Sequence, residues 1–257
     1  MIKTLIYLYI TLLYTFSGLF GQQLSSSFTP TVLGDSVNTT TYDEVNPIYF
    51  PKTTTLYFTR RNHPENKFGE IESEDVWTAT LLADSSWSSP KRLPDNVNNS
   101  QFNNILSVLD NGNSLLVSGR YTKQGKWFKR GISLVTKLSD TIWSTPKSIK
   151  VPGFQHVNDG KALYAFMNDA KTVIFFSFDK QHLGVKNNLF VSIKKKNDKW
   201  SRPKIIKKID KASSSETCPW LSSDEDTLYY SSNRNGHFDM YHAVQDTSGT
   251  KYLDWVE

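Results

Sequence analysis

The sequence predicts an all-β protein built from repeated four-stranded antiparallel units. A short motif, Trp-Ser-X-Pro-Lys followed by an aliphatic residue, occurs three times at regular spacing. Between its copies, runs of β-branched and aromatic residues alternate with polar turn residues, as in strands joined by tight turns. After residue 21, no segment shows the periodicity of an amphipathic helix.

The motif defines the length of the repeat. Its copies begin at Trp87, Trp143 and Trp200, which are 56 and 57 residues apart, and another 55 residues lead to Trp255 in the final stretch LDWVE. We interpret these four tryptophans as structural markers of the repeat. The repeats of 55–60 residues are expected at about 46–99, 100–157, 158–213 and 214–257.

Each repeat contains three apolar strands in a fixed order, and the stretch after the motif supplies a fourth, outer strand. Strands are expected first at 47–50, 105–109, 162–167 and 219–222. The next set is 55–59, 114–118, 172–177 and 227–232, and the third is 75–81, 132–138, 189–195 and 239–244. Turn residues such as Asn111-Gly112 separate them.

Four-stranded units of this length, repeated in tandem, are typical of a β-propeller. A long β-sandwich is the alternative fold, and the fixed order of four recurring features argues against it. In a propeller, the repeated tryptophans would pack on the neighbouring blade. Asp75 and Asp239 start equivalent strands, where a carboxylate can accept hydrogen bonds from turn amides.

The fourth repeat contains the segment SSSETCPWLSSDEDTLYYSSNRNGHFDMY (213–241), which resembles the TolB-type, WD-like propeller repeat. The matching residues are Glu216, Pro219, Ser223, Asp224, Leu228, Tyr229, Ser231, Ser232, Asn233, Arg234, Gly236, Asp239 and Tyr241. The first repeat keeps a diluted copy of this pattern. The resemblance implies a propeller fold and leaves the function open, because such repeats serve as scaffolds for many activities.

The N-terminus predicts export from the cytoplasm. Lys3 is followed by a charge-free run over residues 5–20 and then by small residues, which is the order of a secretory signal peptide at 1–21. A membrane anchor is the alternative. The propeller domain would then be residues 22–257, located in the periplasm, at the outer membrane or outside the cell. Cys218, the one cysteine, is expected to be a buried small hydrophobic residue.

A second internal match concerns the ends of the chain. PTVLGDSVN (30–38) matches PKRLPDNVN (90–98), the outer strand of the first repeat. Residues 30–38 would therefore be an outer strand without a blade of its own. They could close a four-bladed ring beside residues 239–244, or the chain could hold an incomplete set of blades.

The loops between the second and third strands of each repeat are expected on one face of the propeller. This face would gather cationic and polar side chains that could bind an anionic glycan, a peptide or a protein. The candidate binding residues are Arg60, Arg61, His63, Arg120, His182, Asn233, Arg234 and His237. Polar loops that are simply solvated are the alternative explanation.

No cofactor or metal is expected, because the five histidines do not occur at ligand spacing. The net charge of +5 is mild and lacks the concentrated stripe of a nucleic-acid binder. The basic segment 194–211 holds nine Lys or Arg against two Asp. It is expected to be a solvated strand edge, with binding to an acidic envelope polymer as the alternative.

The sequence therefore predicts a monomeric, non-catalytic binding or scaffold module of the cell envelope, with an envelope protein or glycan as its partner. No membrane span is expected after signal cleavage. The enzymatic alternative is a sialidase-like or other propeller glycoside hydrolase. The stretches ending at Trp87 and Trp143 resemble the second half of the sialidase Asp box, but they lack its serine and glycine.

Overall fold

The computed structural model describes residues 32–154, 163–178, 186–211 and 213–257. The chain divides into residues 1–33 and a compact unit, Gly34–Glu257, and the description below concerns this unit. The predicted signal peptide (1–21), residues 30–31 and His182 lie outside the described residues. Within the described ranges, no helix is both long and apolar enough to cross a bilayer.

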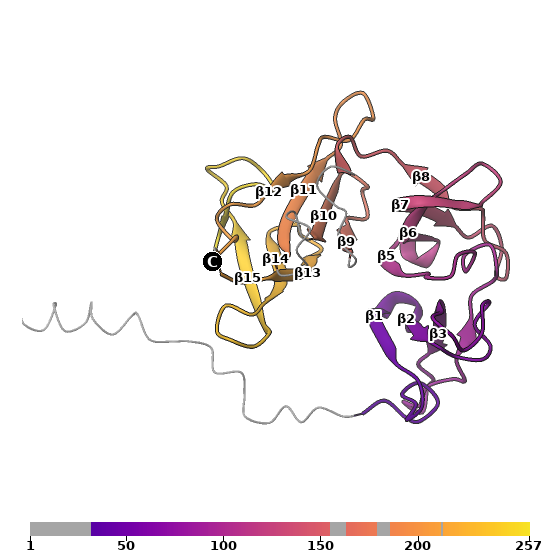
Figure 1. The fold of residues 1–257 in the computed structure, drawn as a ribbon. Coiled ribbons are helices and arrows are strands. Elements are labelled where there is room, and N and C mark those ends of the chain that lie inside the picture. Colours follow the sequence, from indigo (N-terminus) through magenta and orange to yellow (C-terminus); the bar gives the residue numbers. More distant parts are fainter. Residues whose placement is uncertain (1–31, 155–162, 179–185, 212) are drawn as a thin grey trace, which may run out of the picture. The chain divides into compact units, whose positions relative to one another are not determined.

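Four antiparallel four-stranded sheets form a β-propeller of four blades, which confirms the predicted fold class (Figure 1). Blade 1 contains β1 (Glu44–Phe50), β2 (Thr55–Arg61), β3 (Glu74–Thr80) and β4 (Lys91–Arg92). Blade 2 contains β5 (Ile105–Leu109), β6 (Ser114–Tyr121), β7 (Trp127–Thr136) and β8 (Lys147–Ile149). Blade 3 contains β9 (Tyr164–Met167), β10 (Val173–Phe178), β11 (Asn188–Ile193) and β12 (Lys204–Ile205). Blade 4 contains β13 (Glu216–Leu221), β14 (Thr227–Ser232), β15 (Asp239–Gln245) and β16 (Trp255–Val256). Two short 3-10 helices connect the first and second strands of blades 1 and 2: η1 (Pro51–Thr53) and η2 (Asp110–Gly112).

The repeated motif turns the chain from the third strand into the outer strand. In blade 2, the Ser144 amide donates to the Thr136 carbonyl at 2.8 Å, and the Ser144 hydroxyl accepts the Thr136 amide at 2.9 Å. Ser88 and Ser201 make the same pair of bonds in blades 1 and 3. The serine therefore satisfies both backbone groups of the third strand at a position where an ordinary residue would satisfy one.

The motif tryptophan packs on the preceding blade. Trp143 belongs to the apolar cluster between blades 1 and 2, Trp200 to that between blades 2 and 3, and Trp255 to that between blades 3 and 4. Trp255 pairs with Gln245, just as Trp143 pairs with Lys137, so the tail LDWVE contains the fourth copy of the structural marker. Its side chain is 1% exposed.

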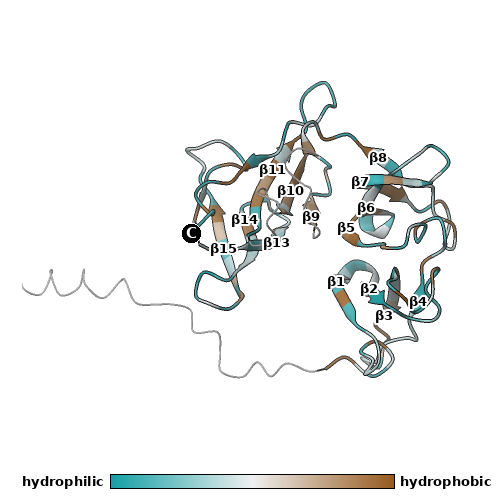
Figure 2. Ribbon diagram, viewed as in Figure 1, coloured by the Kyte–Doolittle hydropathy of each residue, from teal (hydrophilic) through white to brown (hydrophobic). Residues whose placement is uncertain are grey.

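Apolar residues concentrate on the strands (Figure 2). All residues of β10 are buried. One apolar cluster joins each pair of consecutive blades, but none among the described residues joins blade 4 to blade 1. Tyr57, Leu116 and Phe175 are buried at the central position that faces the next blade. Tyr229, at the same position of blade 4, is 37% exposed, beside Trp220 at 51%.

The outer-strand hypothesis for residues 30–38 needs correction in its described part. Gly34–Asn38 forms a turn, with the Val37 and Asn38 amides donating to the Gly34 carbonyl. Val97 and Asn98 donate to the Pro94 carbonyl in the same way, so the internal sequence match reflects a common turn. Val37 packs on Leu56, Phe58 and Trp77 of blade 1 rather than on β15, whose outer edge pairs with β16.

The prediction for Cys218 is wrong, because this residue is exposed. It lies in an irregularity of β13, between Thr217 and Trp220, where the pairing with β14 shifts register. Its φ of 52° places it in the left-handed region, which turns the side chain away from the buried positions on either side.

Candidate binding site

Arg60, a predicted binding residue, is used inside the fold. It is 4% exposed, and its Nε donates to Glu44 at 3.0 Å. Its Nη2 donates to the carbonyls of Ser36 and Val37, and its guanidinium lies 4.8 Å from the Trp77 ring. These contacts tie the N-terminal turn to blade 1.

The remaining predicted residues of blade 1 also have intramolecular partners. Arg61 is exposed and donates to Glu74 at 2.8 Å. The His63 ring lies edge-on to Tyr42 and Trp77, at 4.6 and 4.7 Å between centroids. Burial and the nearby charge of Arg60 lower the pKa of His63, so its imidazole stays neutral at pH 7.

The blade 4 residues form a turn that holds the blade together. Arg234 donates to Glu257 at 2.8 Å and to the Tyr230 hydroxyl at 3.1 Å, and it stacks on the Tyr241 ring at 4.3 Å. The Asn233 side chain accepts the Ser215 amide at 2.7 Å. His237 is exposed and lies 3.2 Å from Asp239.

Arg120 is the predicted residue with a different environment. It lies near the end of β6, where the pairing with β7 shifts register on both sides of it. Ser148 of β8 fixes this irregular end, because its hydroxyl accepts the Tyr121 amide at 2.8 Å and donates to the Tyr121 carbonyl at 3.0 Å. The Ser133 hydroxyl donates to the Gly119 carbonyl at 2.8 Å. Backbone contacts therefore set the direction of Arg120.

Gly131 of β7 lets the arginine side chain cross the strand. A Cβ atom at this position would lie 2.4 Å from Cγ and 2.6 Å from Cδ of Arg120, closer than any side-chain contact allows. Its φ of 149° is also unfavourable for other residues. The glycine is thus required for the position that Arg120 occupies.

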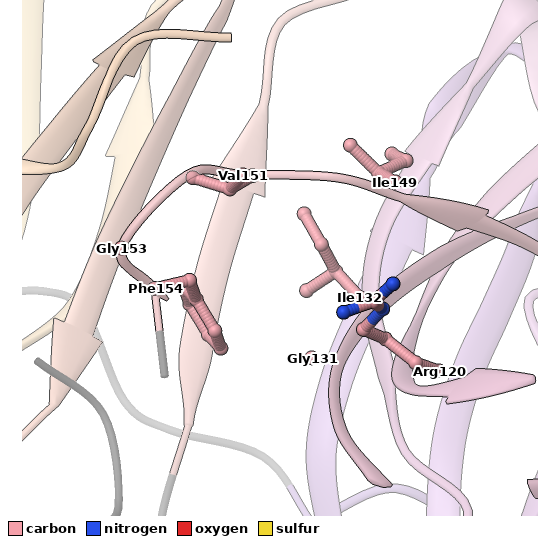
Figure 3. Close-up of a pocket in the computed structure, with 7 residues that line it drawn as sticks. All are labelled: Arg120, Gly131, Ile132, Ile149, Val151, Gly153 and Phe154. Carbon is pink, nitrogen blue, oxygen red and sulfur yellow. The ribbon is translucent and has the colours of Figure 1, made fainter. Parts of the chain in front are cut away.

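A cavity of about 220 Å³ lies beside this arginine (Figure 3). Figure 3 shows the guanidinium next to Ile132, with Ile149, Val151 and Phe154 on the other sides. The described lining residues are Arg120, Gly131, Ile132, Ile149, Val151, Gly153 and Phe154. The site therefore combines one fixed positive charge with aliphatic and aromatic walls.

The guanidinium of Arg120 has no acceptor among the described residues. Its Nε atom is buried and forms no hydrogen bond. Its guanidinium carbon lies 5.3 Å from the centroid of the Phe128 ring. Buried donors are almost always paired in folded proteins, so a guanidinium without a described acceptor beside a cavity marks a candidate site for an anionic group.

The repeat shows what this position holds elsewhere. In each blade, one backbone amide donates to the carbonyl of the residue directly before the second strand, which marks an equivalent position. These amides belong to Leu81, Lys137, Lys194 and Gln245. Six residues before these equivalent amides, the four blades carry, in order, Asp75, Gly131, Asn188 and Asp239. Blade 2 alone has no polar side chain at this position.

In blade 1 this position is a buried polar node. The Asp75 carboxylate accepts the Lys67 amide at 2.7 Å, Asn103 at 2.9 Å and Arg92 at 3.1 Å, and the residue is 0% exposed. Burial raises the pKa of Asp75, although the three donors partly offset this effect. In blade 2, Gly131 provides no carboxylate at this position, and the guanidinium of Arg120 provides hydrogen-bond donors beside it. The cavity can thus accept a carboxylate from outside.

This pairing of Arg120 with Gly131 was not predicted, although the sequence contains the signal. When the third strands of the repeats are aligned by sequence, Gly131 is equivalent to Asp75, and Ile132 is equivalent to Val76. The change from an acidic residue to glycine shows that blade 2 has no side chain at this position. Only the structure shows that the side chain of Arg120 lies over Gly131.

The described lining of the cavity supplies one positive charge and apolar surface. Its described lining has no carboxylate, histidine, serine or cysteine side chain that could act as nucleophile or general base. In the described ranges, no group of three or more His, Cys, Asp and Glu residues is placed to hold a metal ion. Its chemistry is therefore charge recognition by a guanidinium beside an apolar surface.

Comparisons with known proteins give structural matches alone. No family model matches the sequence, and no curated protein matches it. A solved structure described as a complex of BT0996 and RGII is 10% identical with a TM-score of 0.51, and the match covers 84% of this chain and 73% of that one.

Two further solved structures are a putative TolB from Agrobacterium tumefaciens and an endo-arabinase from Bacteroides thetaiotaomicron VPI-5482. The TolB structure is 13% identical with a TM-score of 0.49, and the match covers 82% of this chain but 61% of the TolB chain. The arabinase is 14% identical with a TM-score of 0.49, and the coverage is 89% and 82%. At these identities the likeness concerns the fold alone, and the chain is a four-bladed β-propeller.

Proposed function

We propose that this protein is a non-catalytic binding module of the cell envelope that holds a carboxylate-bearing ligand in the cavity beside Arg120. The observation that supports this proposal is the buried Nε of Arg120, which has no described acceptor, on a side chain that lies over Gly131. Gly131 occupies the repeat position where blade 1 holds the carboxylate of Asp75. A guanidinium recognises a carboxylate through two parallel hydrogen bonds, which gives both charge and geometric selectivity.

The size and walls of the cavity define the ligand further. A volume of about 220 Å³ is below the range of pockets that enclose a whole drug-sized molecule. It suits the end of a longer chain: a carboxylate with a small aliphatic group against Ile149, Val151 and Phe154. A peptide C-terminus with a small aliphatic residue and a terminal uronic acid both offer the carboxylate. The aliphatic walls favour the peptide.

The location in the envelope rests on the charge-free run over residues 5–20. A glycoside hydrolase of the usual kind needs two carboxyl groups flanking the scissile bond. The cavity offers one arginine and no Asp or Glu among its described lining residues. Binding without turnover is therefore the function that this geometry supports best.

The test uses calorimetric titration with two matched probe pairs. One pair is the tripeptide Gly-Gly-Val with a free or an amidated C-terminus, and the other is methyl glucuronoside or its methyl ester. We expect the free-acid peptide to bind the wild type and its amide to bind at least about tenfold more weakly.

Arg120→Gln should abolish this discrimination, whereas Arg61→Ala, which removes an exposed arginine paired with Glu74, should keep it. Preference for the uronic acid over the peptide would assign the ligand to glycans. Binding of both acids that is unchanged in Arg120→Gln would overturn the proposal.

A further inference from the structure

A second recessed surface lies between blades 3 and 4, away from Arg120. It is a groove of about 450 Å³, and its described lining residues are Lys204, Ile205, Lys207, Lys208, Thr250, Leu253 and Asp254. Three of these seven residues are lysines, and the apolar floor consists of Ile205 and Leu253.

One wall of the groove is formed by a connection that is longer than in the other blades. The motif tryptophan pairs with the residue six positions earlier in blades 1 to 3, for example Trp200 with Lys194. In blade 4, Trp255 pairs with Gln245, ten positions earlier. The four extra residues are part of an ordered loop: the Thr250 amide donates to Asp254 at 2.7 Å, and the Tyr252 amide donates to Gln245 at 2.7 Å.

The opposite wall presents its lysines for a simple reason of packing. Ile206 and Ile209, in the turn that follows β12, are both 0% exposed in the cluster between blades 3 and 4. Lys207 and Lys208 lie between these two anchors and therefore face outward. Lys208 pairs with Asp246 at 3.2 Å. In the described part of the chain, the ammonium groups of Lys204 and Lys207 have no hydrogen-bond or ion-pair partner.

The groove also lies in a strongly positive part of the chain. Segment 194–211 holds nine Lys or Arg against two Asp. Both aspartates already have partners, since Asp198 is 3.0 Å from Lys194 and Asp210 is 2.9 Å from Lys186. The surplus charge creates a positive potential at the groove that attracts anions.

We propose that this groove binds the phosphate groups of a linear polyanion. Lysine ammonium groups act as point charges without the planar fork of arginine, so they suit compact phosphate groups better than they suit a single planar carboxylate. A chain with repeated phosphates can contact Lys204 and Lys207 together, whereas an isolated phosphate would gain little from exposed lysines. This site is independent of the Arg120 cavity.

The test measures binding of long-chain inorganic polyphosphate at several salt concentrations. The variant is Lys204→Ala/Lys207→Ala, and the matched control is Lys91→Ala/Lys147→Ala. Lys91 and Lys147 occupy the repeat position of Lys204 in blades 1 and 2, so the control removes the same charge from equivalent exposed sites.

We expect the groove variant to lose about tenfold or more in affinity. Its slope of log affinity against log salt should fall by about 2, one unit for each lost contact. The control should stay within about twofold of the wild type. Gly-Gly-Val binding should be unchanged in both variants, because Arg120 is intact.

Three outcomes would overturn the proposal. Equal losses in the two double variants would mean attraction by net charge alone. Wild-type affinity in the groove variant would mean that the lysines make no contact with the polymer. Binding of polygalacturonate as tightly as polyphosphate would contradict the assignment to phosphate.

Discussion

Blades 1 and 2 carry different residues at the same position of the repeat, Asp75 in blade 1 and Gly131 in blade 2. In blade 1, the buried carboxylate of Asp75 accepts hydrogen bonds from three donors of its own chain. In blade 2, Gly131 contributes no side chain, and the buried Nε of Arg120 has no acceptor among the described residues, beside a cavity of about 220 Å³. The first arrangement places a carboxylate among donors of the same blade, and the second places a guanidinium beside a cavity, where we propose that a ligand binds.

Removal of the blade 1 carboxylate should have the largest effect. Asp75→Ala leaves Arg92, Asn103 and the Lys67 amide without their buried acceptor, so we expect a loss of about 3 kcal/mol in the free energy of unfolding. Asp239→Ala, at the same repeat position but 44% exposed in its side chain, should cost less than about 0.5 kcal/mol. Urea denaturation measures both. Equal losses would contradict the view that blade 1 uses this carboxylate as a structural node.

The second prediction concerns the glycine of blade 2. Gly131→Ala should destabilise the fold by about 1–3 kcal/mol, because the backbone disfavours a side chain there and the new Cβ displaces Arg120. Gly236→Ala is the matched control, since Gly236 also has a positive φ, of 94°, but has open space around its Cβ position.

Thermal denaturation should show the larger loss for Gly131→Ala. The double variant Gly131→Ala/Arg120→Ala should recover part of that loss, because the side chain that meets the new Cβ is shortened. No recovery would mean that contact with Arg120 is irrelevant to the requirement for glycine.

The third prediction separates the two arginines. Arg120→Met should leave stability unchanged or raise it by up to about 1 kcal/mol, because the buried unpaired donor is removed and the apolar stem is kept. Arg92→Met removes a donor from Asp75 and should lower stability by about 1–3 kcal/mol. Denaturant titration of the two variants in the same buffer compares them directly. A large loss in Arg120→Met would assign Arg120 a structural role.

The smallest effect is a dependence on pH that comes from the titratable group Asp75, for which blade 2 has Gly131 at the same repeat position. Burial raises the pKa of Asp75 in the folded state, so folding favours its protonated form. The stability of the wild type relative to Asp75→Asn should thus be greatest below the usual Asp pKa of about 3.9 and fall as the pH rises through the higher folded value. Unfolding measured at several pH values between 3 and 6 checks the sign. A rise with pH would contradict it.

The repeat architecture was accessible from the sequence because its markers have local causes. The serine of the motif bonds to the third strand within its own hairpin, and the tryptophan fills the gap to the preceding blade, so both recur at a fixed spacing. Trp255 could be placed for this reason, even though only two residues follow it.

The roles of individual cations could not be predicted, because they depend on contacts between distant residues. Arg60 is buried by the carbonyls of Ser36 and Val37, which precede it by more than twenty residues. Arg234 is held by Glu257 at the other end of its blade. Arg120 belonged to the same predicted group, and only the structure distinguishes its unpaired Nε from these satisfied arginines.

The central claim is that blade 2 takes from a ligand the carboxylate that blade 1 supplies itself. The most direct test is the melting temperature of the wild type and of Arg120→Met in increasing isobutyrate, with isobutyramide as the uncharged match. Because a ligand that binds the folded state raises stability with its concentration, we predict a rise for the wild type in isobutyrate alone and none for Arg120→Met. An equal rise in both proteins, or no preference for the acid over the amide, would contradict the account.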